Sequence, residues 1–250
     1  MSIGIYGDSF ASWDTTNEFG WYNLLAKKLN TDVYSYEHKT RSTYGFPATS
    51  TFYSYKKFME YNDKHEYNIF VASAASKYTK FVDLFMHKPP VPLSGIHSLD
   101  WYTDDPNLRP DASEILDRIR SWLIVSDDEF MYAVQELILQ HMERNTVDSN
   151  GHLIILASDI DETFCQHRKD NSCADFGLWG LCELMYKEMG VTKETRPHVL
   201  NEKGDKISCH MSDVTNEVLA DLLYKHIMTG EKMTLPERIP HNHTWEYYYN

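Results

Sequence analysis

Residues 3–10 constrain the fold of this chain more than any other stretch. They read Ile-Gly-Ile-Tyr-Gly-Asp-Ser-Phe, an apolar run that Gly7 interrupts just before Asp8 and Ser9. A short apolar run that ends at a glycine is typical of a buried strand. We therefore expect a strand, a tight turn at Ser9 and a helical segment beyond it. In that setting the Ser9 hydroxyl is exposed at the sheet edge, and the Ser9 backbone N–H points toward a developing oxyanion.

Strands and helices are expected to alternate along the rest of the chain. Short apolar runs predict strands at 33–36, 68–72 and 152–157. Apolar residues at helical spacing predict helices at 19–29, 53–61, 112–125, 128–145 and 175–189. A last helix is expected between Ser212, its N-cap, and Gly230, which closes it. This alternation implies a layered α/β fold with parallel strands and ligands at their carboxyl ends.

Two of these helices have a clear apolar face. In 128–145 the residues expected to be buried are Phe130, Val134, Leu137, Ile138 and Met142. In the last helix they are Val214, Val218, Leu219, Leu222, Leu223 and Ile227. Both faces are expected to pack against the core.

The 250 residues are expected to form a single α/β domain over positions 1–234. Residues 83–128 differ in character, because they combine several prolines with the aromatic residues Trp101 and Tyr102. We interpret this stretch as an insertion over the carboxyl edge of the sheet, either a lid that shapes a substrate pocket or a structural flap or oligomer contact. Residues 235–250 are an aromatic C-terminal tail that could pack across a partner subunit in a homo-oligomer.

The composition argues against several classes of function. The 24 basic and 37 acidic side chains give a formal charge of −13, which does not fit nucleic-acid binding or docking on an anionic membrane. No apolar run approaches transmembrane length, and no signal peptide is expected. The four cysteines include no Cys-x-x-Cys pair, which favours reduced thiols and a cytoplasmic location. No cofactor is expected. No metal site is expected either, because His241 and His243 lack a third ligand.

His210 is the best candidate for a base that acts on Ser9. It stands in the sequence Ser-Cys-His-Met-Ser, in a loop that leads into the last helix. In this arrangement His210 accepts the Ser9 proton, and an acyl-enzyme forms and is hydrolysed. Cys209 is a second conceivable nucleophile, although adjacent residues on a loop usually point apart.

These two features resemble the GDSL (SGNH) esterase and lipase family. Gly7-Asp8-Ser9-Phe10 matches the family's first motif, and His210 lies where the family has its catalytic histidine. The sequence around His210 also resembles divergent, phage-encoded members. The resemblance covers roughly residues 3–228, with the insertion outside it. It implies a three-layer α/β/α sandwich with a parallel, flavodoxin-like sheet, and a serine hydrolase that cleaves an acyl or acetyl ester of a small molecule, lipid or carbohydrate.

The resemblance also implies an oxyanion hole. The backbone N–H groups of Ser9 and Gly45 would contribute to it, and Ala48 could replace Gly45. In the family an asparagine follows the strand at 68–72, but here Ser73 stands at the end of that strand, and Ser73 or Ser76 could donate the hydrogen bond instead.

A third catalytic residue is expected to orient His210. The family has an aspartate three residues before the histidine, where this chain has Ile207. Asp205 could supply the carboxylate from the same loop. A backbone carbonyl could also orient the imidazole, which would leave a Ser9–His210 dyad.

Two other functions remain open. Asp159-x-Asp161-x-Thr163 follows the strand at 152–157 and resembles the first motif of haloacid-dehalogenase-type phosphatases, in which Asp159 would be the nucleophile and Asp161 the general acid, with Mg²⁺. The same aspartates could simply cap a turn or line the rim of a pocket. A non-catalytic GDSL-like scaffold, acting as a binding or structural protein, would account for the missing asparagine and aspartate.

Overall fold

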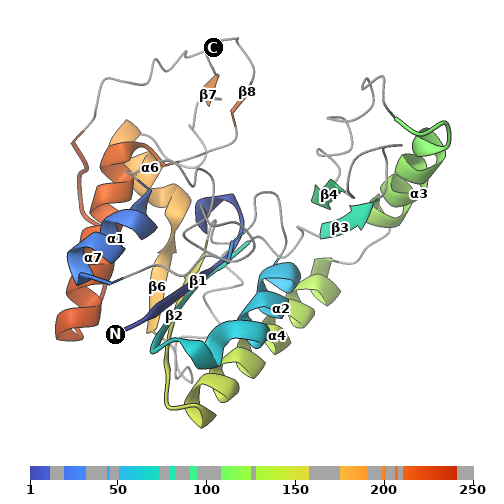
Figure 1. Cartoon of the computed structure of the whole chain (residues 1–250). Coiled ribbons are helices and arrows are strands. Elements are labelled where there is room, and N and C mark those ends of the chain that lie inside the picture. Colours follow the sequence, from blue (N-terminus) through green and yellow to red (C-terminus); the bar gives the residue numbers. More distant parts are fainter. Residues whose placement is uncertain are drawn as a thin grey trace.

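The computed structural model describes residues 1–11, 20–31, 44–45, 51–73, 79–82, 91–94, 108–124, 128–157, 175–190, 199–200, 206–207 and 211–240. Its centre is a four-stranded sheet in the order β1-β2-β5-β6 (Figure 1). The strands are β1 (Ile3–Tyr6), β2 (Tyr67–Ala72), β5 (His152–Ala157) and β6 (Asp175–Gly180). Every neighbouring pair is parallel, so the carboxyl ends of all four strands meet at one edge of the sheet.

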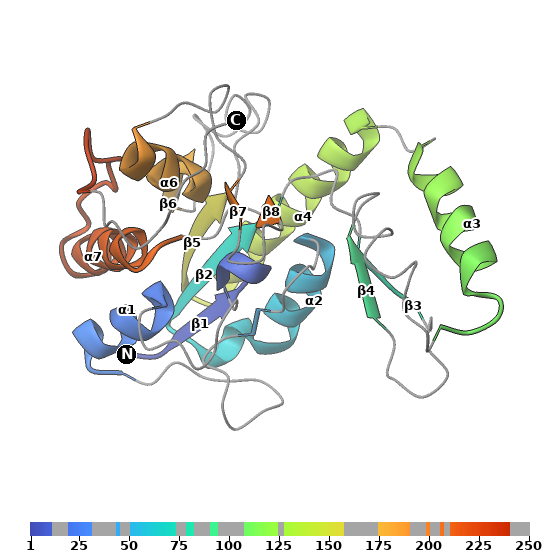
Figure 2. The same ribbon diagram turned by 90° about the horizontal axis from the view of Figure 1, so that it is seen from above.

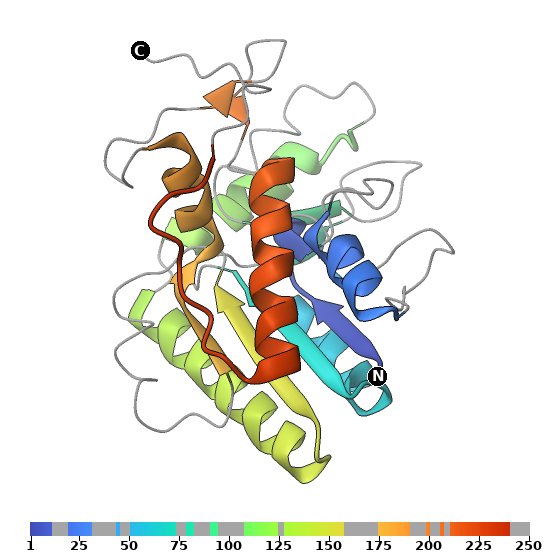
Figure 3. The same ribbon diagram turned by 90° about the vertical axis from the view of Figure 1, so that its left-hand side faces the viewer.

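Alternate residues of the strands feed two separate hydrophobic clusters. One cluster joins Ile5, Val71 and Leu156 to helices α1 (Trp21–Leu29), α6 (Leu181–Met189) and α7 (Asp213–Thr229). The other joins Tyr6, Phe70 and Ile155 to α2 (Thr51–Tyr61) and α4 (Asp128–Asp148). Figures 2 and 3 show these two groups of helices on opposite sides of the sheet. Strand side chains point alternately to the two faces, so each face is buried by its own helices.

Two pairs of short strands and helix α3 lie outside this sheet. Strands β3 (Thr79–Val82) and β4 (Val91–Ser94) form an antiparallel pair, and α3 (Ala112–Ile124) lies next to them, beyond α2 and α4 (Figure 2). Strand β4 and helix α3 are the regular elements described within 83–128, the stretch interpreted as an insertion. A second antiparallel pair, β7 (Val199–Leu200) with β8 (Lys206–Ile207), precedes α7.

The expected elements are largely confirmed where the structure describes them. Strands at 68–72 and 152–157 and helices at 53–61, 112–125 and 128–145 appear with boundaries shifted by up to three residues, and the helix expected from 19 begins at Trp21. Ser212 and Gly230 cap α7 as expected, with Gly230 in the left-handed region at φ 69°. The strand expected at 33–36 lies outside the described residues.

Two expectations were wrong. The helix expected over 175–189 is a strand followed by a helix, because Gly177 and Gly180 disfavour a helix and Asp175 pairs with Ile154 of β5. The apolar face expected in α4 is right for Met142 and Ile138, which pack in the α2/α4 cluster, and wrong for Leu137. Leu137 is 65% exposed, whereas Leu139 is fully buried together with Met142.

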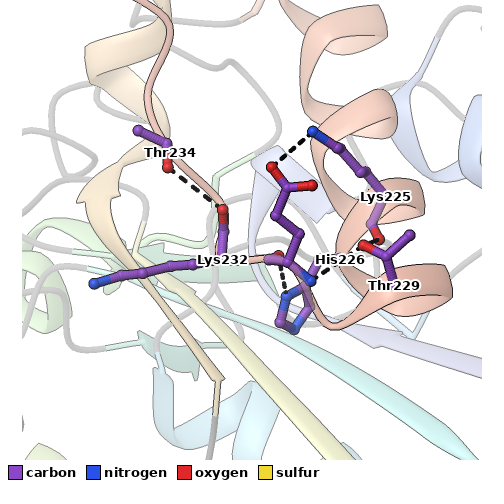
Figure 4. Close-up of polar contacts among 6 residues, drawn as sticks. Lys225, His226, Thr229, Lys232 and Thr234 are labelled. Carbon is purple, nitrogen blue, oxygen red and sulfur yellow. Dashed lines mark hydrogen bonds and ion pairs between the residues drawn. The ribbon is translucent and has the colours of Figure 1, made fainter.

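The chain after α7 turns back along the molecule. Residues 231–240 run beside α6 in Figure 3, and their Met233 and Ile239 are buried in the α1/α6/α7 cluster. The turn is held by polar contacts, drawn in Figure 4: Lys225 pairs with Glu231 at 2.7 Å, and His226 Nδ1 lies 2.9 Å from the Glu231 carbonyl oxygen. The expected tail of 235–250 therefore begins as a packed segment, while 241–250 lies outside the described residues. None of the described helices combines the length and the apolar character needed to cross a membrane.

Candidate active site

The turn after β1 is fixed by Gly7 and Asp8. A Cβ atom at Gly7 would lie 2.7 Å from the Val71 Cβ and 2.9 Å from the Ala11 Cβ, so only glycine fits between these neighbours. Asp8 is fully buried, and its Oδ1 accepts a hydrogen bond from the Phe10 N–H at 3.1 Å. Its carbonyl oxygen accepts from the Ala11 N–H at 3.0 Å. Asp8 therefore caps the short 3₁₀ turn Ser9–Ala11 and sets the backbone of Ser9.

Ser73 at the end of β2 holds the other oxygen of Asp8. The Ser73 Oγ donates to Asp8 Oδ2 at 2.8 Å, and both side chains are buried. The Ser73 carbonyl oxygen accepts from Thr51 Oγ1 at 3.1 Å and from Gln135 Nε2 at 3.3 Å. One polar cluster thus links the ends of β1 and β2 to α2 and α4.

This geometry bears on the expected oxyanion hole. A hydroxyl has a single proton, and that of Ser73 is donated to Asp8 in this arrangement. Ser73 could donate to an oxyanion only by giving up that bond. In the structure its side chain positions Asp8, and through Asp8 the turn that contains Ser9.

Gly45 lies beside β1, at the side opposite β2. The Tyr44 N–H donates to the Ile5 carbonyl oxygen at 2.8 Å, and the Tyr44 ring stacks on Tyr6 with centroids 5.1 Å apart. Gly45 is buried. The described pair of residues therefore lies along the outer edge of β1, the strand that leads into Gly7.

A relay of hydrogen bonds connects the Ser9 turn to the start of α7. The Trp21 indole Nε1 donates to the Phe10 carbonyl oxygen at 2.7 Å, and the Trp21 backbone N–H donates to Asn216 Oδ1 at 2.9 Å. Asn216 Nδ2 in turn donates to the carbonyl oxygens of Met211, at 3.1 Å, and Ser212, at 2.9 Å. Phe10 directly follows Ser9 and Met211 directly follows His210. Two segments some 200 residues apart in sequence are thus tied through Trp21 and Asn216.

Neither Trp21 nor Asn216 was identified from the sequence as a site residue. Trp21 was assigned only to an amphipathic helix. The available signal was Asn216 itself, a polar residue beside Leu219, Ala220 and Leu223 on the buried side of α7. A buried amide must find partners for both its oxygen and its nitrogen, so such a position predicts a fixed network.

The remaining sequence candidates lie outside the described residues. These are the Ser9 side chain, Ala48, Ser76, Asp159, Asp161, Asp205, Cys209 and His210. Among the residues that the structure describes, no three or more His, Cys, Asp or Glu side chains come together in a way that could hold a metal ion.

A second polar cluster lies between Tyr6 and the start of β2. The buried Tyr6 hydroxyl donates to Asn68 Oδ1 at 2.9 Å, and the Tyr44 hydroxyl lies 2.9 Å from His65 Nε2. Burial raises the pKa of Tyr6 well above its ordinary value. Burial and, to a smaller extent, the neighbouring Lys64 ammonium lower the pKa of His65 to about 4. The imidazole of His65 is therefore neutral at pH 7, and its role is to hydrogen-bond the Tyr44 hydroxyl inside the core.

Comparisons with known proteins give one match. No family model matches the chain, and neither does any curated protein. The chain is similar to a solved structure from Desulfitobacterium hafniense DCB-2, described as a putative lipolytic protein of the G-D-S-L family. The two are 10% identical, the alignment covers 90% of this chain and 98% of the other, and the TM-score is 0.47.

Proposed function

We propose that this chain is a serine hydrolase of the GDSL type that cleaves an acyl or acetyl ester of a small molecule, a lipid or a carbohydrate. Ser9 is the nucleophile and His210 the general base. The observation that carries the proposal is the relay from Phe10 through Trp21 and Asn216 to Met211, since it ties together the segments that contain the two residues. In this proposal the fold is a three-layer α/β/α sandwich with a flavodoxin-like sheet.

The reaction follows from the chemistry of the two side chains. His210 takes the Ser9 proton as Oγ attacks the ester carbonyl carbon, and it later gives that proton to the leaving alcohol. Water then hydrolyses the acyl-enzyme with His210 again as base. The backbone N–H groups of Ser9 and Gly45 stabilise the oxyanion, and Ser73 joins them if its hydroxyl turns away from Asp8.

The test is labelling of the folded protein with a fluorophosphonate probe, combined with hydrolysis of short p-nitrophenyl esters. We expect an adduct on Ser9 and ester hydrolysis that is lost in Ser9→Ala and in His210→Ala. Ser2→Ala is a matched control, because Ser2 precedes the amino end of β1, whereas the turn of Ser9 follows its carboxyl end. An unlabelled Ser9 in folded protein would contradict the proposal. Activity that needs Mg²⁺ and is lost in Asp159→Asn but kept in Ser9→Ala would indicate a phosphatase instead.

A second candidate is a GDSL-like scaffold that binds a partner or a ligand without turnover. The hydrogen bond from Ser73 to Asp8 favours it, because it removes a side-chain donor from the expected oxyanion hole. Loss of one such donor typically lowers the rate by about 10²–10³-fold. Folded protein with neither probe labelling nor ester hydrolysis is the outcome expected of the scaffold.

A further inference from the structure

Glu188, near the end of α6, has a buried carboxylate that the proposed mechanism does not use. Its Oε2 accepts a hydrogen bond from the Ser212 Oγ at 2.7 Å, and the residue is 5% exposed. Its Oε1 is buried and has no hydrogen-bond partner in the described part of the chain. An unpaired carboxylate oxygen is costly to bury, so a donor is expected close to Oε1.

Ser212 connects this carboxylate to the segment that enters α7. Its Oγ accepts from the Thr215 N–H at 3.2 Å as the N-cap, while its proton goes to Glu188. His210 lies two residues before Ser212, so the Cα atoms of these residues can be no more than about 7 Å apart. Asn216 further fixes the carbonyl oxygens of Met211 and Ser212. The backbone that directly follows His210 in sequence is thus anchored next to Glu188.

We propose that Glu188 is the acidic partner that orients His210. This inference rests on the proposed function. The Nδ1–H of His210 donates to Glu188 Oε1, which leaves Nε2 free to take the proton of Ser9. The carboxylate of Glu188 stabilises the imidazolium that forms when the proton has moved. Glu188 acts here as a positioning residue, in the place for which the sequence offered Asp205.

The surroundings of Glu188 make a specific test possible. The neighbouring charged residues on the two helices are Lys187, Glu183 and Asp213, of which Lys187 and Asp213 are exposed. Glu183 is the residue whose Oε1 accepts from the Gly180 N–H at the start of α6. Asp213→Asn therefore removes an equal charge from the first turn of α7 without touching the buried carboxylate, and is the matched control.

The experiment measures two quantities over a range of pH. The first is the rate at which a fluorophosphonate labels Ser9, and the second is the pKa of His210 followed by NMR. We expect Glu188→Gln, which keeps an acceptor for Ser212, to slow labelling strongly, since an acid-to-amide change in a Ser–His–Asp triad costs about 10⁴-fold. We also expect it to lower the pKa of His210, because a negative neighbour favours the imidazolium. Asp213→Asn should leave both near their wild-type values.

The outcomes separate this inference from the proposed function. A pKa of His210 that is unchanged in Glu188→Gln overturns the role of Glu188, even if Ser9 is labelled. Loss of labelling in Asp205→Asn, but not in Glu188→Gln, assigns the role to Asp205. If Ser9 is never labelled while the pKa of His210 still falls in Glu188→Gln, the pairing stands and the hydrolase does not. If Glu188→Gln does not fold, the test uses the downfield NMR signal of the His210 Nδ1 proton in Asp205→Asn. A signal that persists in Asp205→Asn supports the pairing of His210 with Glu188, and a signal that is lost contradicts it.

Discussion

The two faces of the sheet are built from different side chains. On the face covered by α1, α6 and α7 the strands contribute Ile, Val and Leu side chains, and the helices are joined by polar contacts such as those of Trp21 with Asn216 and of Ser212 with Glu188. On the face covered by α2 and α4 the strands contribute Tyr6 and Phe70, and hydrogen bonds tie the polar ends of the aromatic residues. On the first face, Trp21 and Asn216 link α7 to the turn of Ser9. On the second face, Thr51 of α2 and Gln135 of α4 bind Ser73, which in turn binds Asp8 next to that turn.

This difference predicts that the α2/α4 face mainly stabilises the fold and that the α1/α6/α7 face mainly positions the proposed site. Disturbing the α2/α4 face should mainly lower the free energy of unfolding, because its polar groups are buried and depend on one another. Disturbing the α1/α6/α7 face should change the reactivity of Ser9 more than the stability, because its polar contacts relate the two halves of the proposed site. Asp8 is linked to both groups of helices, through Ser73 to α2 and α4 and through Phe10 to Trp21 of α1, and its loss should affect both quantities.

The largest effect is expected from Asp8→Ala. The change leaves the Ser73 hydroxyl and the Phe10 N–H without their acceptor in a buried position. Each hydrogen bond to a charged acceptor contributes about 1.5–3 kcal/mol, so the free energy of unfolding should fall by about 3–5 kcal/mol, and labelling of Ser9 should stop. Urea unfolding measures the first quantity. Ser73→Ala, which removes only one of the two bonds, should cost clearly less, and an equal or larger loss would contradict the central place given to Asp8.

The α2/α4 face should also make stability depend on pH through His65. Its pKa is about 4 in the folded chain and 6.5 in an unfolded one, so unfolding takes up a proton between these values. Stability is complete above about pH 6.5 and falls as the pH drops toward 4, by up to about 3 kcal/mol. His65→Gln keeps an acceptor for Tyr44 but cannot take up this proton. The wild type should therefore lose its advantage in unfolding free energy over His65→Gln as the pH falls from 6.5 to 4. A constant difference from pH 7 to pH 4 would show that His65 does not carry the effect.

A smaller loss of stability is expected from Asn216→Ala on the α1/α6/α7 face. The change leaves the Trp21 N–H and the Met211 carbonyl oxygen without the Asn216 amide, and we expect a cost of about 2 kcal/mol. The Ser212 carbonyl oxygen keeps the Asn216 backbone N–H and the Thr215 hydroxyl as donors. The rate of Ser9 labelling should fall by a larger factor than the destabilisation of the fold explains at a temperature where the protein remains folded. Glu217→Ala, an exposed neighbour on α7, is the control and should change neither quantity. Equal labelling in both variants would remove the link between this face and the site.

The sequence predicted three of the four strands of the sheet, β1, β2 and β5, because each of them is a short apolar run. The 68–72 and 152–157 runs are central strands, buried on both faces, and need no alternation to be recognised. The sequence predicts a helix over Asp175–Gly180 because the apolar residues of this short stretch run on into those of α6. Gly177 and Gly180 disfavour that helix, and pairing with β5, which depends on residues distant in sequence, selects the extended form.

The site was predicted in its outline and not in its connections. Gly7, Asp8 and Ser9 could be identified because a turn of this kind depends on local chemistry. The bonds from Asp8 to Ser73 and from Trp21 to Asn216 join residues 65 and 195 positions apart, and no local pattern encodes such contacts. In the same way, Glu188 could not be told from any other helix glutamate until Ser212 was found beside it.

The smallest effect is expected at the outer edge of the α1/α7 contact, where Lys28 pairs with Asp221 at 2.7 Å. Both side chains are accessible to water, and surface pairs of this kind typically contribute about 0.2–1 kcal/mol. Asp221→Asn should therefore leave the labelling of Ser9 unchanged and shift the unfolding free energy only slightly, less so as salt is added. This variant sharpens the comparison, because it weakens the same helix pair as Asn216→Ala without touching the buried relay. A loss of labelling comparable to that in Asn216→Ala would mean that the helix contact as a whole, and not the Asn216 amide, sets the geometry of the site.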